Sequence, residues 1–311
     1  MTQTTTFGPR STADRVLAGI DLTGKHILVT GCNSGIGFET TSALAANGAH
    51  VIAAAPTLQE AARACQEVGY HCSPVECDLG DLDSIAAAAE AVRRLQLPLD
   101  AIIANAGVAN LPSARVRYGV EEHFRVNHVG HFALVNDLAG NLRDASGRIV
   151  IVTSRAAGVR GGPDGIMFDN LAGQRFYHPA MFHAQSKLAN ALYAKELSRR
   201  LQPRGIAVNA VNPGEVRGTG LGRYWGLGRR LGRLAALPFS RTPAQGAATI
   251  ALLAGSPNVS GITGEYWQDC AIARANPVLD DGAMAVRLWN TSEAIIAAHR
   301  PSRLQALARA A

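Results

Sequence analysis

The sequence predicts a doubly wound α/β fold with a mostly parallel, seven-stranded sheet and helices on both faces. Short apolar runs rich in β-branched residues alternate along the chain with longer helical stretches. Near-continuous apolar runs are typical of strands buried on both faces of a parallel sheet. The alternation of strand and helix favours right-handed crossovers within one sheet, and no internal repeat or linker divides the pattern.

Each apolar run is interpreted as a strand, and each stretch between two runs as a helix. The expected strands are, in chain order, residues 26–30, 50–55, 70–77, 100–104, 148–153, 206–211 and 264–269. The expected helices between them are residues 35–47, 57–68, 81–96, 121–139 and 179–202. We expect a single domain over residues 21–311, with a helical tail at about 276–311. Residues 1–20 are expected to form a mobile or loosely docked extension.

The composition is that of a soluble globular chain, because 47% of the 311 residues are hydrophobic and 17% are charged. No apolar run reaches the length of about 18 residues that a membrane-spanning helix needs, and the first residues lack the apolar stretch of a secretory signal. The net charge of +6 comes from dispersed arginines without an aromatic platform, which argues against nucleic-acid binding. The five cysteines form no CxxC pair, so we expect reduced thiols in a cytoplasmic protein, without a disulfide or a metal site.

A glycine-rich turn follows the first strand directly and opens the first helix, with the sequence Thr30-Gly31-Cys32-Asn33-Ser34-Gly35-Ile36-Gly37. Glycines at this place allow a tight turn and a close approach of the backbone to a pyrophosphate, which then lies at the helix N-terminus. The turn therefore predicts a dinucleotide site, to which we assign Gly31, Asn33, Ser34, Gly35, Ile36 and Gly37.

Three further motifs lie at the carboxyl ends of expected strands, the edge at which open α/β sheets bind ligands. They are Asp78-Leu79, Asn105-Ala106-Gly107 and Pro213-Gly214. With the TGxxxGIG spacing of the turn, they resemble the short-chain dehydrogenase/reductase family, which has a Rossmann-like fold. The resemblance runs from about residue 22 to 297, and residues 241–248, 260–270 and 285–289 resemble the retinol-dehydrogenase-like branch. It implies that Asp78-Leu79 contacts adenine, that Asn105-Ala106-Gly107 borders the cofactor, and that Pro213-Gly214 lies at the nicotinamide.

The choice between NAD and NADP depends on the end of the second strand. NAD enzymes of the family usually carry an acid there, and NADP enzymes an arginine, whereas this chain has Ala55-Pro56. The resembling branch normally has a Cys-Arg pair at these two positions, and the loss of the arginine removes a planar phosphate partner. Ser34 or Arg63 could take its place, so the sequence leaves NADP slightly favoured over NAD.

The resemblance also assigns four catalytic positions, one of which departs from the family. Asn127, Ser154 and Lys187 match, but His183 stands four residues before the lysine, where the family has tyrosine. Residues four apart on a helix lie on the same face. In the family, the serine orients the substrate oxygen and the tyrosine transfers the proton. The lysine lowers the pKa of the tyrosine and holds the nicotinamide ribose, and the asparagine supports a water chain.

The histidine changes the proton chemistry of the site without removing it. The phenol of tyrosine titrates near pH 10 and needs a cationic neighbour, whereas imidazole titrates near 6.5. The charge of Lys187 favours the neutral form of His183, which makes it a poorer acid, a better base and a group of shorter reach than a phenol. Tyr177 is a candidate substitute acid that we interpret as structural. We interpret His178, Phe182 and His128 as packing residues.

Residues 215–240 are expected to form the substrate lid, with Tyr224 and Trp225 lining an apolar pocket and the arginines facing outward. Two other interpretations of this Arg-rich segment stay open: contact with a membrane surface, and docking of an acidic partner such as an acyl carrier protein. The resemblance implies a homodimer or tetramer through the helices at 121–139 and 179–202, although the branch includes monomers.

The leading hypothesis is an NAD(P)-dependent oxidoreductase that acts on a carbonyl or secondary alcohol of a fairly apolar small molecule. Ser154 would hold the substrate oxygen, His183 would relay the proton and Lys187 would bind the ribose. The departure at His183 leaves two alternatives open. One is a non-redox isomerase, lyase or cyclase in natural-product biosynthesis, with His183 as general base; the other is a dinucleotide-binding protein without activity.

Overall fold

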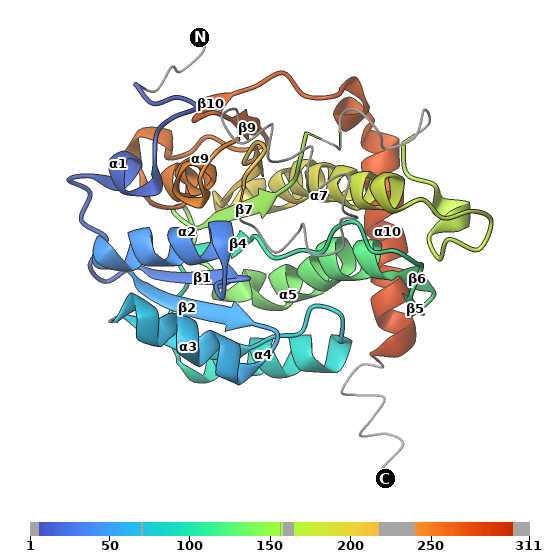
Figure 1. The fold of residues 1–311 in the computed structure, drawn as a ribbon, viewed down its shortest axis with the longest axis horizontal. Helices are drawn as coiled ribbons and strands as arrows, with labels where there is room; N and C mark the ends of the chain where they lie inside the picture. The colour runs from blue at the N-terminus through green and yellow to red at the C-terminus, as the bar shows by residue number, and fades with distance from the viewer. Residues whose placement is uncertain (1–5, 70, 156, 158–164, 218–239, 301–311) are drawn as a thin grey trace.

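The computed structural model describes residues 6–69, 71–155, 157, 165–217 and 240–300. Its central sheet has the strand order β10-β9-β8-β7-β4-β1-β2-β3 (Figure 1). The bounds are β1 His26–Thr30, β2 His50–Ala55, β3 Cys72–Glu76, β4 Ala101–Ala104, β7 Arg148–Val152, β8 Ala207–Asn212, β9 Tyr266–Gln268 and β10 Ala271–Ile272. Neighbouring strands are parallel except β10, which pairs antiparallel with β9. The predicted fold class and its seven strands are confirmed, and β10 is an addition that the sequence did not predict.

Helices cover both faces of the sheet (Figure 1). One face carries α1 Ala13–Leu17, α2 Gly35–Ala46 and α9 Pro243–Gly255. The other carries α4 Leu82–Arg94, α5 Gly130–Leu138 and α7 Pro179–Leu201. Helix α3 Leu58–Val68 packs beside β2 and β3. The apolar strand residues are buried between these layers, as expected for a parallel sheet covered on both sides.

The helix predicted at 121–139 is not continuous. A hairpin of β5 Val116–Arg117 and β6 Val120–Glu121 takes up its beginning, and a π-helical segment, Phe124–Val129, precedes α5. Asn127 lies in this wider helical segment, a geometry that is frequent at functional sites. An added Cβ at Gly130 would lie only 2.3 Å from the carbonyl oxygen of Leu79, so the helix packs closely on the turn after β3.

The expectation that residues 1–20 are loosely attached is wrong for α1. Ala13, Val16 and Leu17 are buried, and α1 packs against α9. Their spacing of three and four residues places all of them on one face of the helix, which explains the docking. The helix is only five residues long, too short for its periodicity to stand out in the sequence.

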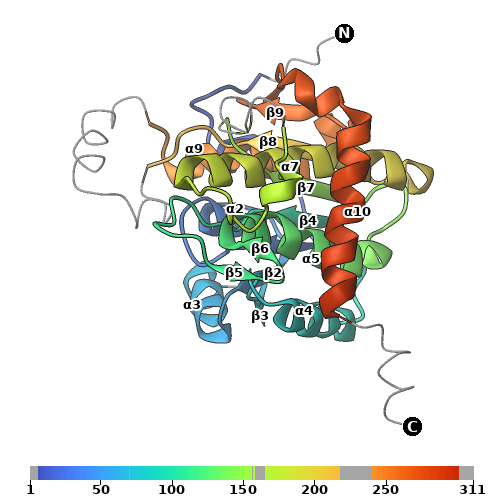
Figure 2. The ribbon, with the colours of Figure 1, turned by 90° about the vertical axis from the view of Figure 1, so that its right-hand side faces the viewer.

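Helix α10, Gly282–His299, crosses α5 and α7 (Figures 1 and 2). The indole of Trp289 lies 4.9 Å from the ring of Phe132 and 5.8 Å from that of Tyr193. The Nε2 atom of His128 is 2.8 Å from the hydroxyl of Ser292. This chain's own C-terminal helix therefore covers part of the surface at which the sequence placed an oligomer contact, and the oligomeric state stays a prediction.

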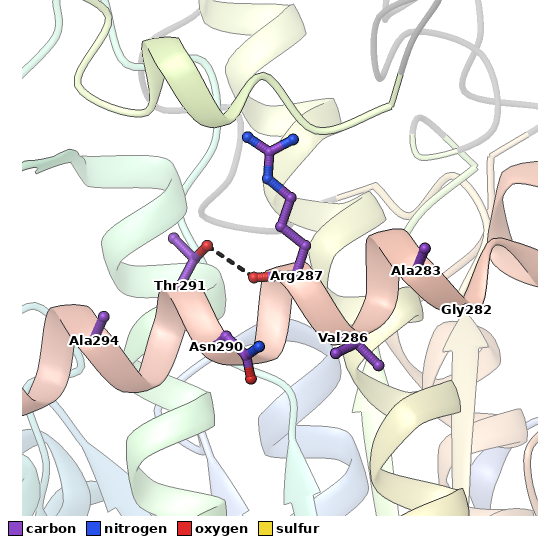
Figure 3. Close-up of a pocket in the computed structure, with 7 residues that line it drawn as sticks. All are labelled: Gly282, Ala283, Val286, Arg287, Asn290, Thr291 and Ala294. Atoms are coloured by element: carbon purple, nitrogen blue, oxygen red, sulfur yellow. Dashed lines mark hydrogen bonds between the residues drawn. The ribbon is translucent and has the colours of Figure 1, made fainter.

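An open groove of about 840 Å³ lies along the outer side of α10 (Figure 3). The Thr291 hydroxyl donates back to the carbonyl of Arg287 at 2.8 Å. None of the predicted site residues belongs to the groove, so it is not the candidate site. Its lining is Gly282, Ala283, Val286, Arg287, Asn290, Thr291 and Ala294.

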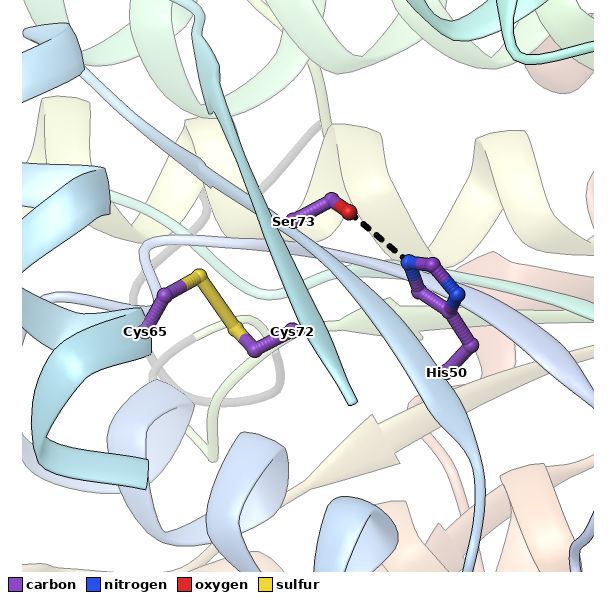
Figure 4. The surroundings of a disulfide bond; sticks show 4 residues. All are labelled: His50, Cys65, Cys72 and Ser73. Atoms are coloured by element: carbon purple, nitrogen blue, oxygen red, sulfur yellow. Dashed lines mark hydrogen bonds between the residues drawn. A yellow bond between two sulfur atoms is a disulfide. The ribbon is translucent and has the colours of Figure 1, made fainter. Parts of the chain in front are cut away.

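The expectation that all five cysteines are reduced thiols is wrong, because Cys65 and Cys72 form a disulfide between the last turn of α3 and the start of β3 (Figure 4). The chain reverses between the two elements and brings the two Cα atoms to 5.2 Å, within the usual range for a disulfide. Cys32, Cys77 and Cys270 are buried, and among the described residues none of them takes part in a disulfide. Because structural disulfides are typical of oxidising compartments, the cytoplasmic location stays a prediction.

None of the helices in the described ranges combines the length and apolar character needed to cross a membrane. Most of the predicted lid, residues 218–239 with Tyr224 and Trp225, lies outside the described residues, as does the end of the predicted tail, residues 301–311.

Candidate functional site

The glycine-rich turn meets the motif after β4 at the carboxyl edge of the sheet. Gly31 has a φ of +70°, and an added Cβ there would lie 2.9 Å from the Cα of Ala106. A Cβ at Gly37 would lie 1.9 Å from the carbonyl oxygen of Gly31. Both positions therefore require glycine, and the close approach leaves the backbone of the turn accessible to a ligand.

Helix α2 begins in this turn. Ser34 is its N-cap residue, but the Ser34 hydroxyl makes no capping hydrogen bond, and the side chain is exposed. The positive end of the helix dipole and the first N–H groups are suited to an anion. Together with the glycine contacts, this arrangement fits the pyrophosphate of a dinucleotide.

Thr30 connects the nucleotide motifs to the predicted catalytic residues. Its Oγ1 atom accepts the N–H groups of Asn105 at 3.0 Å and Ala106 at 3.1 Å. The Nε2 atom of His131 is 2.9 Å from the same oxygen, and its Nδ1 atom is 2.8 Å from the carbonyl of Asn127. Burial lowers the pKa of His131 to about 4, so the ring is a neutral bridge at ordinary pH.

The motif after β3 lies at the same edge. Asp78 is exposed and accepts the N–H of Gly80 at 2.8 Å, while Leu79 is buried.

The Pro213-Gly214 turn after β8 is supported from one side by Arg241. Gly214 has a φ of +80°, and an added Cβ there would lie 2.6 Å from the guanidinium carbon of Arg241. Arg241 donates to the carbonyl of Pro213 at 3.1 Å and forms an ion pair with Asp269. This support could not be predicted from the sequence, because it joins residues far apart in the chain.

Lys187 is buried at the centre of the site. Its Nζ atom donates to the carbonyl of Val152 at 3.1 Å, and its own carbonyl accepts the Thr153 hydroxyl at 2.6 Å. An added Cβ at Gly107 would lie 3.4 Å from Nζ, which places the lysine beside the motif after β4. Burial lowers the pKa of Lys187 from 10.5 to about 8.

His183 occupies the predicted position one helical turn before Lys187. Its Nδ1 atom is 3.2 Å from the carbonyl of Val108, which can only accept, so Nδ1 carries the hydrogen. Burial, and in smaller part the electrostatic effects of Lys187 and His123, lower the pKa of His183 to about 3. The neutral ring therefore presents its lone pair at Nε2 and is a proton acceptor, not a donor, at that nitrogen.

Asn127 holds the backbone of Val108, whose carbonyl accepts the hydrogen bond from His183. The Asn127 Oδ1 atom accepts the N–H of Val108 at 2.7 Å, and Nδ2 donates to the carbonyl of Val108 at 3.0 Å. Nδ2 also donates to the hydroxyl of Ser186 at 2.9 Å, and that hydroxyl donates to the carbonyl of His183 at 2.8 Å. The predicted residues Asn127, His183 and Lys187 are thus brought together around Val108 and Gly107.

Ser154 lies two residues beyond the end of β7, where the Val152 carbonyl binds Lys187, and is partly exposed. Tyr177 donates its hydroxyl to the carbonyl of Leu111 at 2.8 Å. Burial and the carboxylates of Glu121 and Glu122 raise the pKa of Tyr177 well above its ordinary value. This environment supports the structural interpretation of Tyr177, since its proton is committed to a backbone bond and hard to release.

Val108, Thr30 and Arg241 are the contributors that sequence reasoning missed. Val108 acts through its backbone, which carries no side-chain signal, and Thr30, the first residue of the turn motif, was given no role of its own. Among the described residues, no cluster of three His, Cys, Asp or Glu side chains is arranged to hold a metal ion.

Comparison with known proteins agrees with this geometry. The family model described as short chain dehydrogenase matches residues 25–168. The human WW domain-containing oxidoreductase is 37% identical over 296 residues, which cover 92% of this chain and 71% of that protein. Human retinol dehydrogenase 14 is 35% identical over 317 residues, covering 93% of this chain and 91% of that protein. The structure of a blue fluorescent protein from a metagenomic library in complex with NADPH is 26% identical, with a TM-score of 0.64, over 79% of this chain and 96% of that one.

The chain belongs to the short-chain dehydrogenase/reductase family and to its retinol-dehydrogenase-like branch. Its relatives are named as oxidoreductases and dehydrogenases, so the chain is assigned to this class of enzymes. The predicted family and fold are confirmed, whereas the role of His183 stays a prediction.

Proposed function

We propose that this protein is an NAD(P)-dependent oxidoreductase for a secondary alcohol or carbonyl of a fairly apolar small molecule, with His183 as the proton-handling group. The observation that carries the proposal is the hydrogen bond from His183 Nδ1 to the Val108 carbonyl, one turn from Lys187. This bond leaves Nε2 as the nitrogen that takes a proton. Ser154 would hold the substrate oxygen, and Lys187 would bind the nicotinamide ribose.

Alcohol oxidation would start from the neutral form of His183, which is the prevalent form at neutral pH. A nicotinamide held at its ribose by Lys187 would supply the hydride chemistry. Nε2 of His183 would take the hydroxyl proton as the carbonyl forms, so the ring leaves the step as imidazolium and returns its proton to solvent. The reverse reaction needs a proton on Nε2 beforehand, which a pKa of about 3 makes rare at neutral pH.

The choice of nucleotide follows from the end of β2. Thr57 caps α3 by accepting the N–H of Glu60 at 3.2 Å, and the Thr57 hydroxyl is 3.3 Å from the Glu60 carboxylate. Burial, and in smaller part the charge of Glu60, raise the pKa of Cys32 in the glycine-rich turn to about 12. Arg63 lies 3.9 Å from Glu67 and is mostly exposed. A carboxylate whose charge reaches the turn opposes a 2′-phosphate, so we propose tighter binding of NADH than of NADPH, the reverse of the preference drawn from the sequence.

The first experiment titrates the purified protein with NADH and NADPH and follows nucleotide fluorescence. We expect micromolar binding, with the lower Kd for NADH, and an improved Kd for NADPH in Glu60→Gln. A panel of alcohols and carbonyls is then assayed at 340 nm, where we expect nicotinamide reduction by alcohols to exceed the reverse reaction. Absence of binding to either nucleotide would rule out the proposal.

Two substitutions test His183 directly. His183→Phe removes the ring nitrogens and should lower turnover by about 100-fold or more, because general acid–base catalysis commonly contributes that much. His183→Tyr should raise carbonyl reduction, since Lys187 then lies beside a phenol. Near-normal turnover in His183→Phe would contradict the proton role.

A non-redox isomerase, lyase or cyclase is the second candidate. The neutral His183 ring supports it, because a general base does not need a nicotinamide partner. Product formed without any absorbance change at 340 nm would favour this candidate, and stoichiometric nicotinamide turnover would eliminate it.

A further inference from the structure

A second buried histidine, His123, packs against the ring of His183. The two ring centroids are 6.0 Å apart with an interplanar angle of 67°. The other side of His123 is stacked on Tyr177, at 6.4 Å and 26°. The side chains of His123 and its partner Glu121 are fully buried, and neither residue has a role in the proposed proton transfer.

The hydrogen bonds of His123 determine which nitrogen carries its hydrogen. Its Nδ1 atom is 2.9 Å from Oε2 of Glu121, an acceptor. The same carboxylate accepts the N–H groups of His123 at 2.8 Å and Phe124 at 2.7 Å. Nε2 of His123 accepts the N–H of Leu111 at 3.4 Å. His123 therefore carries its hydrogen on Nδ1 and uses its lone pair to hold the Leu111 peptide.

Both backbone polar groups of Leu111 are hydrogen-bonded to side chains. His123 accepts its N–H, and the Tyr177 hydroxyl donates to its carbonyl at 2.8 Å. Val108, whose carbonyl accepts Nδ1–H of His183, lies three residues earlier in the same segment. The position of this carbonyl consequently depends on Asn127 at one end of residues 108–111 and on His123 at the other.

We propose that His123, held by Glu121, is a positioning residue that fixes the segment 108–111 and so keeps the hydrogen of His183 on Nδ1 and its lone pair on Nε2. An imidazole has two nitrogens that compete for one hydrogen, whereas the tyrosine usual in this family has one hydroxyl. A histidine at position 183 therefore needs a fixed acceptor for Nδ1, and the buried pair of Glu121 and His123 supports that acceptor. The catalytic meaning of this inference rests on the proposed function.

Loss of the His123 acceptor would leave the buried N–H of Leu111 without this partner, which is unfavourable. The segment would then shift to satisfy the N–H elsewhere, and the Val108 carbonyl would move from Nδ1 of His183. Displacements of about 1 Å in a positioned group can lower turnover by about 100-fold, so a loss of at least tenfold is expected from a partial shift.

Two substitutions distinguish the effect of losing the hydrogen bond from Leu111 to His123 from the effect of losing the aromatic ring of His123. His123→Phe keeps an aromatic ring without an acceptor, and His123→Gln places an amide oxygen within reach of the Leu111 N–H. The full-length protein is labelled with ¹⁵N-histidine, and the His183 signals are assigned by their loss in His183→Phe. The nitrogen shifts then report directly which atom carries the hydrogen, without any substrate.

We expect His183 to be a single Nδ1–H form in the wild type and in His123→Gln, and a mixture of both forms in His123→Phe. The value of kcat should fall at least about tenfold in His123→Phe, with KM changed less than about threefold, and should stay near the wild-type value in His123→Gln. The control is His128→Phe, which changes another fully buried histidine whose Nε2 atom faces Ser292. It should lower stability but leave the His183 signals unchanged.

A single Nδ1–H form of His183 in His123→Phe would overturn the inference, whatever the effect on turnover. A mixture in the His128→Phe control would also overturn it, because general loosening would then explain the change. If His183→Phe retains full turnover, the proposed function fails. The nitrogen shifts of His183 in the His123 variants then still decide whether His123 is a positioning residue.

Discussion

Replacing Lys187 by methionine should stabilise the nucleotide-free protein while impairing its activity. Burial lowers the pKa of Lys187 from 10.5 to about 8. The lowered pKa corresponds to about 3 kcal/mol of unfavourable burial of the charged form. Methionine has a similar length and no charge to bury.

The hydrogen bonds at the site reduce this gain only slightly. Lys187→Met loses the bond from Nζ to the Val152 carbonyl, worth about 1 kcal/mol. That carbonyl also accepts Nδ2 of Asn190 at 3.1 Å, so it keeps a partner. We therefore expect the free energy of unfolding at pH 7 to rise by about 2–3 kcal/mol.

The pH dependence of stability distinguishes removal of the buried Lys187 charge from a general packing effect. Between about pH 8 and 10.5 the unfolded wild type holds a proton on Lys187 that the folded protein releases, so wild-type stability rises with pH in this window. The advantage of Lys187→Met should shrink accordingly, by about 2 kcal/mol between pH 8 and 9.5. Below pH 8 both states are protonated, and the advantage should be constant.

The assay is urea unfolding of the apoprotein, followed by circular dichroism at pH 7, 8 and 9.5. Lys195→Met is the matched control, because Lys195 lies on the same helix with an exposed side chain 3.5 Å from Asp280. Its stability should change by less than about 1 kcal/mol. A variant at position 187 that is less stable than the wild type at pH 7, or whose advantage is independent of pH, would refute the reasoning.

Four further predictions concern stability and association. Replacing Cys65 and Cys72 together by serine should lower the free energy of unfolding by about 2.5 kcal/mol, the value for a short closed loop; unchanged urea midpoints with and without reductant would contradict the disulfide. Trp289→Ala should cost about 3–5 kcal/mol, measured by thermal unfolding, because it removes the indole between α10 and the helices beneath it. Because α10 covers those helices, light scattering of the wild type should show no association through α5 and α7. Burial lowers the pKa of His128 to about 3 and that of His131 to about 4. The contribution of these neutral rings to the free energy of unfolding should therefore be fully present above pH 6.5. Below pH 6.5 the free energy of unfolding should fall by up to about 1.4 kcal/mol per pH unit for each ring. Equal urea midpoints at pH 6.5 and 4.5 would count against that burial.

The order of strands and helices could be predicted because the central strands are buried on both faces. Such burial leaves a near-continuous apolar run in the sequence, and β1 and β2 begin and end as predicted, at His26–Thr30 and His50–Ala55. The short elements α1 and β10 were missed, because each is too short to carry a period of its own. Helix α1 is stabilised by the distant helix α9, and β10 by pairing with the neighbouring strand β9.

The disulfide could not be predicted from the absence of a CxxC pair. Its formation depends on the reversal between α3 and β3, a feature of the backbone path that residue types alone do not specify. The same limit applies to Arg241, whose contact with the turn at Gly214 joins segments separated along the chain.

The sequence by itself determined the fold class, the family and the positions of Asn127, Ser154, His183 and Lys187, because these depend on local patterns and fixed spacings. The tertiary structure decided the state of the site. Whether His183 gives or takes a proton depends on burial and on the acceptor at Nδ1, and that acceptor is a backbone carbonyl 75 residues away along the chain. Backbone carbonyls are the same at every residue, so only the folded chain could show which one meets the ring.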